Sequence, residues 1–505
     1  MTPPFAKLAR HLANWREWEL NPIVIKELRQ GVRSWTVTGM LLFFLALLFL
    51  ASLGFLVGQS IDGNVNLALG GRMFSVFVII LAAASVFFIP LYTGVRVAAE
   101  RQDNNPDLLY VSTLSPARII LGKFLCSTYL VVLFFSACMP FMAFTNLLRG
   151  VDLLTVFFIL AFLFLLVCAS NSIAIFLACI PASRPFKVLF ALAGFILSFW
   201  VVIPIWASLE LMGAGVGAMM AQPNFWLGCL VAFGLGLAVM GLFFVLSVAL
   251  ISPPSANRAR PVRIYFTWFW GFGGLVAWGW SWRTADPLWL WAWTGWTACL
   301  LALTLVATIS NSDQLSLRVR RTIPPSSAKR LVAFFFFNGA AGGLLWVAGL
   351  FAATCFLSHA LIATLPASAL PTVDDWRKLG VTAVYAADYA LTALLLQRRF
   401  LPRHPPKLAG LLAVLLAGGW AIAPSLFLFF ANRLTWKSVE GLQLGNAFNA
   451  GFGRDHSELV AHQWFAGGWL LVALALNLTW FLRQVRNFRP PESPKAPPAT
   501  GRGSP

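Results

Sequence analysis

Apolar stretches long enough to cross a bilayer recur from one end of this 505-residue chain to the other. An α-helix needs about 20 apolar residues for that crossing, because each residue advances it by about 1.5 Å. The chain is 59% hydrophobic and only 11% charged, which is too little charge to cover a water-facing surface. The sequence therefore predicts an all-α, polytopic α-helical membrane protein.

Counting the apolar runs predicts about twelve transmembrane helices. The first six fall at 37–58, 73–98, 122–148, 153–180, 187–211 and 225–251, and the second six at 263–281, 288–309, 331–357, 380–397, 408–430 and 464–482. We expect a cytoplasmic segment at 1–36, a six-span domain at 37–257, a second six-span region at 258–483 and a disordered Pro/Ser/Gly-rich tail at 484–505. The second region is either a degenerate repeat of the first or a set of accessory spans, and the latter is favoured because the motifs described below occur once.

The distribution of basic residues predicts the orientation. With the N-terminus in the cytoplasm, about 29 of the 37 Lys and Arg residues fall on the cytoplasmic side. An even number of spans then places the C-terminus in the cytoplasm as well. The net charge of +19 is spread between spans, which favours membrane lipids over nucleic acid as the basic residues' partners. All seven cysteines lie inside apolar segments and are expected to be buried hydrophobic residues rather than disulfides or metal ligands.

The segment at 21–35, "NPIVIKELRQGVRSW", predicts an amphipathic helix just before the first span. Asn21 suits the N-cap and Pro22 the first helical position. An apolar face and a basic face lie side by side, formed by Ile25, Leu28, Val32 and Trp35 and by Lys26, Arg29 and Arg33, respectively. Such a helix lies in the membrane interface, where it is either only a lipid anchor or a functional part of the protein.

A second unusual segment connects the predicted spans two and three, on the cytoplasmic side. It reads "AERQDNNPDLLYVSTLSPARIILGK", residues 99–123, and its charged start is followed by an apolar run and a Ser-Pro turn. An ordinary connecting loop would be polar throughout. A short helix that presents apolar side chains from such a loop is suited to insert into a partner's groove, or to dock on its own spans.

Together these two segments resemble the permease subunits of type-2 ABC exporters. In that family an "NP-x-x-x-KE-x-R" elbow helix precedes the first span, and here the matching residues are Asn21, Pro22, Lys26, Glu27 and Arg29. The family's coupling loop carries a Glu, an acidic-Leu-Leu run, "LSP" and "GK", matched by Glu100, Asp107, Leu108, Leu109, Leu114-Ser115-Pro116 and Gly122-Lys123. Asn105-Pro106 stands where the family often has a Gly-Thr pair.

The resemblance implies a multi-pass permease subunit in a bacterial-type inner membrane, with Glu100, Asp107, Leu108, Leu109, Ser115 and Pro116 at the contact with cytosolic ABC ATPase subunits. The chain has no G-x-x-x-x-G-K-[ST] loop, so ATP and Mg²⁺ are expected on a separate chain and no cofactor or catalytic residue on this one. A second permease chain is a further expected partner if only one unit is functional. The rival hypotheses are a polytopic enzyme acting on lipid-linked substrates and a membrane anchor for an ATPase complex.

A few polar residues inside or beside the spans are secondary candidates. Asp388 and Asn171 lie in predicted spans and form either an intramembrane polar site or structural hydrogen bonds. His456, Glu458 and His462 in the largest outer segment lack the spacing of a zinc site, and Asp374-Asp375 lacks a third acid. We therefore expect no metal site. The nine Trp residues between 268 and 296 are typical of an interfacial belt, or of a surface that stacks on a head group.

Overall fold

The computed structural model describes residues 22–62, 69–102, 115–148, 151–181, 187–189, 191–192, 194–196, 221–365, 371–431, 443–452 and 456–491. Within these ranges the chain is helical and has no β-strand. It divides into two compact units, Met1–Ser252 and Pro253–Pro505. The multi-pass helical architecture expected from the sequence is confirmed.

Ten of the described helices are long and apolar enough to cross a membrane, where the sequence predicted about twelve. The predicted fifth span, 187–211, falls largely outside the described residues. The predicted seventh span forms a 26-residue helix, α12, Ala259–Thr284, that is not among the ten. Its many Trp and Gly residues, together with Arg260 and Arg263, make it less hydrophobic than a helix rich in Leu, Ile and Val.

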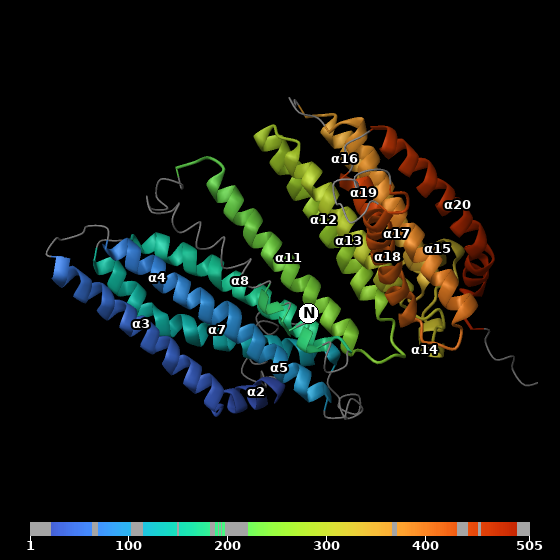
Figure 1. Ribbon diagram of the computed structural model, residues 1–505. Coiled ribbons are helices and arrows are strands. Elements are labelled where there is room, and N and C mark those ends of the chain that lie inside the picture. Colours follow the sequence, from blue (N-terminus) through green and yellow to red (C-terminus); the bar gives the residue numbers. More distant parts are fainter. Residues whose placement is uncertain are drawn as a thin grey trace, which may run out of the picture. The chain divides into compact units, whose positions relative to one another are not determined.

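Unit 1 begins with the predicted amphipathic helix and continues through long apolar helices (Figure 1). In order these are α2, Pro22–Val32; α3, Trp35–Asp62; α4, Leu69–Ala83; α5, Ile89–Gln102; α7, Pro116–Leu147; α8, Leu153–Cys179; and α11, Phe225–Ile251. Helices α7 and α8 form the centre of the unit. Helix α8 packs against α5, α7 and α11, and α7 also packs against α2, α3 and α4. Aromatic side chains fill the core on the other side of α7, where the rings of Phe44 and Phe134 lie 5.2 Å apart.

The second span is one continuous rod in which α4 and α5 are joined by a π-helical turn, Ala84–Phe88. A π turn removes regular i to i−4 hydrogen bonds and is commonly stabilised by a polar side chain. Here the hydroxyl of Ser85, which is fully buried, donates to the carbonyl oxygen of Leu81 at 2.6 Å. Pro90 follows directly and lacks the N–H that a regular helix would use. The span thus carries a local irregularity near its middle.

Unit 2 is built around α17, which packs against α13, α18, α19 and α20. Its elements after α12 are α13, Leu288–Ile309; α14, Leu317–Arg320; α15, Ser327–Phe336; α16, Ala340–Ile362; α17, Val373–Phe400; α18, Lys407–Ala431; α19, Ala447–Phe452; and α20, His456–Asn487. A capping box starts α17, in which Thr372 and Asp375 satisfy each other's backbone N–H groups.

The predicted ninth span, 331–357, is two helices rather than one. The short amphipathic helix α15 ends at Phe336, and the spanning helix α16 begins at Ala340. Gly339 between them has φ +130°, a conformation that favours glycine. Arg263 of α12 stabilises this break, because its guanidinium donates to the carbonyl oxygens of Phe335, Phe337 and Gly339 at 2.9, 2.7 and 3.1 Å. Sequence hydropathy could not reveal this break, because both helices are apolar.

Candidate functional site

The elbow helix α2 packs against α7 through a face that includes its one acidic residue. Among its described side chains the buried positions are Val24, Glu27 and Gly31, which follow one another at helical spacing. Ile25 is exposed, as is Trp35 at the start of α3, so these two residues of the apolar stripe face away from the protein. Lys26 and Arg29 are exposed as well. The one acidic residue of the helix is therefore its main polar contact with the bundle.

Glu27 lies at the centre of a cluster of charged side chains drawn from three helices. One carboxylate oxygen accepts from Lys123 of α7 at 3.2 Å, and the other lies 3.3 Å from the guanidinium of Arg96 on α5. Lys123 also pairs with Glu100 in the last turn of α5. Because Glu27 is 7% exposed, its charge depends on these partners, and removing one of them would leave a buried charge without compensation.

Arg96 extends the cluster by two hydrogen bonds. It donates to the side-chain oxygen of Gln30 on α2 at 2.6 Å and to the hydroxyl of Tyr92 at 2.9 Å. Two acidic and two basic side chains therefore balance each other across α2, α5 and α7. Sequence reasoning missed Arg96 and Gln30. The signal that could have found Arg96 is a lone basic residue in the last apolar turns of a span, since such a residue needs a counter-charge.

The elbow motif and the predicted coupling loop are thus joined in space. Glu100 lies at the start of the loop, and Lys123 lies just after it, in the second turn of α7. Ser115 caps α7 by accepting from the backbone N–H of Arg118, and Pro116 occupies the first helical turn. Asp107, Leu108 and Leu109 lie outside the described residues, as does Asn21, whereas Pro22 is the first residue of α2.

This arrangement joins the elbow helix to the helices at both ends of the loop. The end of α5 and the start of α7 flank the loop. Glu27 links both of these helices to α2, since its two oxygens hold one basic side chain from each helix. Among the described residues, the charged cluster includes no group of three side chains that could hold a metal ion.

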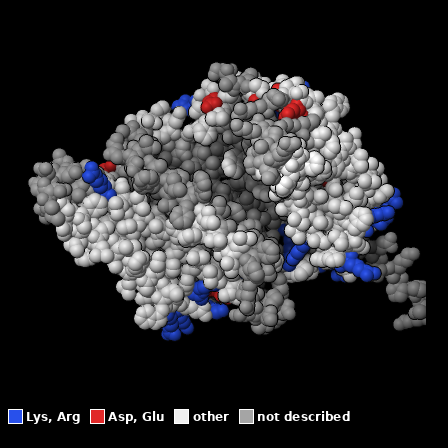
Figure 2. All heavy atoms as spheres, viewed as in Figure 1, with Lys and Arg blue, Asp and Glu red and all other residues white. Residues whose placement is uncertain are grey.

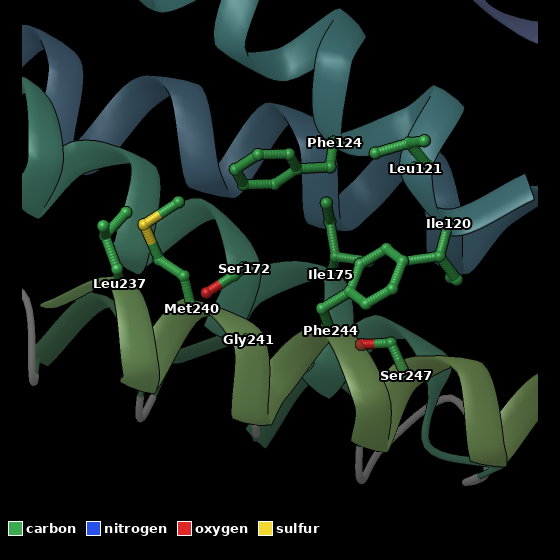
Figure 3. Close-up of a pocket in the computed structure, with 10 residues that line it drawn as sticks. All are labelled: Ile120, Leu121, Phe124, Ser172, Ile175, Leu237, Met240, Gly241, Phe244 and Ser247. Carbon is green, nitrogen blue, oxygen red and sulfur yellow. The ribbon is translucent and has the colours of Figure 1, made fainter. Parts of the chain in front are cut away.

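An apolar pocket of about 270 Å³ lies between α7, α8 and α11 in the same unit (Figure 3). Figure 3 shows side chains of Phe124, Ile175, Met240 and Phe244 around it. The two hydroxyl groups at its wall are already used, because Ser172 donates to Ala169 O and Ser247 to Phe243 O. The pocket is therefore suited to hydrocarbon and offers little to a polar ligand.

The two predicted intramembrane polar residues are both fully buried, but in different units. Asp388 of α17 has two carboxylate oxygens without a hydrogen-bond partner among the described residues. Asn171 of α8 likewise has an unpartnered side-chain amide within the described part of the chain. The structure does not bring either of them to the charged cluster. Neither of them lines the apolar pocket.

Next to Asp388 on α17, a complete hydrogen-bond network links α17, α20 and the segment 443–452. His462 contacts Asn449 Oδ1 through Nε2 at 2.8 Å and Tyr385 through Nδ1 at 2.9 Å. Because an amide oxygen only accepts, Nε2 carries the proton and Nδ1 accepts from the Tyr385 hydroxyl. Tyr385 in turn accepts from the backbone N–H of Gly445, while Tyr389 donates to its carbonyl. The network has a structural role, since all of these groups are satisfied.

At the opposite end of α17 from its basic C-terminus, Asp374 pairs with His456 at 2.9 Å and with Arg377 at 3.2 Å. This contact ties the start of α17 to the start of α20. Among the described residues no three side chains of the types that bind metals lie close together. The Trp-rich segment forms the helical hairpin of α12 and α13. The ring of Trp291 in this hairpin packs against that of Trp376 on α17, with the ring centroids 4.9 Å apart, while Trp282 and Trp296 are exposed.

Comparison with known proteins finds no matching family model, no similar curated protein and no similar solved structure. The charged cluster and the sequence motifs that form it are therefore the features of this chain that bear on its function.

Proposed function

We propose that this chain is the permease subunit of an ATP-driven ABC exporter of the type-2 class, resident in a bacterial-type inner membrane. The proposal combines the two sequence motifs with one structural observation. Glu27 of the elbow motif pairs with Arg96 and Lys123, and Lys123 pairs with Glu100 of the loop motif. Two motifs that are about 70 residues apart in the sequence meet at one buried carboxylate, which is what a shared mechanical role requires.

The proposed mechanism follows from these ion pairs. Cytosolic ATPase subunits bind and hydrolyse ATP and push on the loop that contains Asp107, Leu108 and Leu109. The loop's two flanking helices, α5 and α7, belong to spans two and three, so the push reaches the membrane region directly. The ion pairs of Glu27 carry the same motion into α2, which leads into α3 through a short connection at 33–34. One input thus moves the first three spans together.

The apolar pocket between α7, α8 and α11 supports a hydrocarbon-bearing cargo. Its wall of aliphatic and aromatic side chains favours an acyl or other apolar chain over an ion or a sugar. We propose lipid-like or amphipathic molecules as the substrate class. Because α7 begins at the loop's end, its movement would change the shape of the pocket.

The test uses the full chain carrying an affinity tag, purified from its own host in mild detergent. We expect a cytosolic ATPase to co-purify with the wild-type protein and to be lost from Leu109→Asp, because an added charge prevents an apolar side chain from entering a protein groove. Glu100→Lys is a poorer choice. It would also place a second cation beside Lys123 and disturb the charged cluster itself.

Lys26→Gln is the matched control, because it removes a charge from an exposed position of the elbow helix that forms no ion pair with a described residue. Both variants must elute as the wild type does in size-exclusion chromatography. Unchanged co-purification with Leu109→Asp would reject the proposed contact. Reconstitution with the ATPase separates an exporter from a mere anchor, since only an exporter gives ATP-dependent movement of a labelled lipid.

A further inference from the structure

The end of unit 2 that carries α14 and α15 has a strongly basic surface. Three short segments meet there around a small core formed by Val319, Ile323, Phe337 and Phe488. The rings of Phe334 and Phe337 lie 5.2 and 5.4 Å from that of Phe488, so α15 and the end of α20 are in direct contact. Eight basic residues belong to these segments: Arg318, Arg320, Arg321, Lys329, Arg330, Arg483, Arg486 and Arg489.

The acidic residues do not balance this surface. None of the eight basic side chains forms an ion pair with a described carboxylate. Asp313 is the acid that the described contacts place nearby, and it is occupied by the N–H groups of Ala340 and Trp480. Figure 2 shows the same separation, with blue at the end of unit 2 near α14 and red at the opposite end. Within the described residues this surface therefore carries unbalanced positive charge, which attracts anions.

Helix α15 adds an apolar face to the same surface. One side of the helix is anchored, because Phe334 packs on Phe488 and Arg263 holds the carbonyl oxygens of Phe335 and Phe337. The other side bears Leu331 and Val332, which are 64% and 59% exposed. Lys329 precedes these two residues in the sequence and lies at the edge of that apolar side. No side chain of α15 is fully buried.

We propose that α14, α15 and the C-terminal end of α20 form a binding site for anionic phospholipid head groups. The apolar side of α15 enters the boundary between head groups and acyl chains, where Leu331 and Val332 leave water. The guanidinium groups of Arg318, Arg320 and Arg321 then lie at the level of the phosphates and pair with them, as arginine does best. The positive charge of the surface and the exposed apolar side of α15 together favour a phospholipid. An acidic soluble protein would leave that apolar side uncovered. The inference is independent of the transport function.

The test measures lipid retention by the purified full-length protein in native mass spectrometry. Phosphatidylglycerol and phosphatidylcholine with identical acyl chains are the probes. We expect the wild type to retain phosphatidylglycerol preferentially. The triple variant Arg318→Gln/Arg320→Gln/Arg321→Gln should bind it more weakly by roughly tenfold or more, since each basic residue near an anionic surface contributes about 1 kcal/mol.

Arg399→Gln/Arg403→Gln/Lys407→Gln is the matched control, because it removes three exposed charges from the α17–α18 connection instead. It should keep the preference. Equal retention of both lipids by the wild type, or equal losses in the two triple variants, would overturn the proposal. Capture of an acidic protein without lipid preference would also overturn it.

A second measurement does not depend on the stability of the charge variants. A spin label at Leu331→Cys, in a chain whose seven native cysteines are replaced, should be accessible to oxygen and shielded from a water-soluble nickel chelate in phosphatidylglycerol nanodiscs. A label at Ser326→Cys, before the helix, should show the reverse pattern. Exposure of both labels to the chelate would contradict insertion of α15.

Discussion

At the residue scale, Gly445 is a tightly constrained position in unit 2. Its backbone N–H donates to Tyr385, and its carbonyl accepts from Tyr389, so both groups are fixed by α17. Its φ of +90° is a backbone conformation that residues with a Cβ rarely adopt. A Cβ added there would lie 2.4 Å from the ring of Trp420. One glycine thus allows the segment before α19 to close over α17 and α18.

We expect Gly445→Ala to destabilise unit 2 by roughly 2 kcal/mol or more, from backbone strain and from displacement of the Trp420 ring. Thermal unfolding of the purified protein in detergent measures the change. Gly418→Ala is the control, because a Cβ meets nothing within 4 Å in the middle of α18. That control should be neutral or slightly stabilising. Equal melting temperatures for the two variants would show that the positive φ of Gly445 and its close approach to Trp420 do not affect the stability of unit 2.

At the element scale, α2 shows what the sequence could and could not predict. Its existence, its start near Asn21-Pro22 and its amphipathic pattern follow from local rules of capping and periodicity. The contact made by Glu27 does not, because it depends on Arg96 and Lys123, which are far away in the sequence. A second limit appears in the predicted ninth span, since hydropathy alone does not distinguish α15 from α16. Buried arginine contacts to backbone carbonyls mark that break, and they are a tertiary feature.

Glu27→Gln should loosen α2 from α5 and α7. The amide cannot neutralise two cations, so Arg96 and Lys123 would be left partly buried without a full counter-charge. We expect a loss of about 2 kcal/mol, less than the roughly 3–5 kcal/mol of a fully buried pair because both partners keep some exposure.

Hydrogen–deuterium exchange of residues 22–32 measures the loosening directly. Lys26→Gln, one residue away and exposed, provides the control and should leave the exchange rates unchanged. An equally protected helix in Glu27→Gln would mean that packing of Val24 and Gly31, rather than the ion pairs, holds α2 in place.

At the scale of the whole molecule, the sequence predicted the position of most spans, because each is a local apolar run, but it predicted about twelve spans where ten of the described helices qualify. Helices α3, α8, α11, α13 and α18 lie within a few residues of their expected limits. The two-unit division and the identity of the central helices, α7, α8 and α17, depend on how helices pack and have no local signature. The same holds for the network around His462, whose members lie up to 77 residues apart.

The predicted orientation is testable on intact cells. Thr284→Cys lies at the end of α12 that should face outward, and Ser326→Cys lies in the basic connection that should face the cytoplasm; both positions are exposed. A membrane-impermeant maleimide should label Thr284→Cys in intact cells and Ser326→Cys only after lysis. The native cysteines contribute little background because they lie within long apolar helices. The reverse labelling pattern would invert the topology and place the charged cluster of α2 outside the cell.

The π-helical turn in the second span also bears on the direction in which its last residues point. A π turn accommodates one residue more than a regular helix, and each residue of a helix turns the chain by about 100°. Because the π turn takes up its extra residue locally, a deletion within Ala84–Phe88 that restores a regular helix would leave the residues beyond it facing nearly the same way. A single deletion in the regular part of α4 or α5 before Arg96 would instead rotate the residues beyond it by about that angle, and Arg96 and Glu100 would then point away from Glu27 and Lys123. This second deletion, which leaves hydropathy, span count and helix content almost unchanged, would therefore disconnect the elbow helix from the loop.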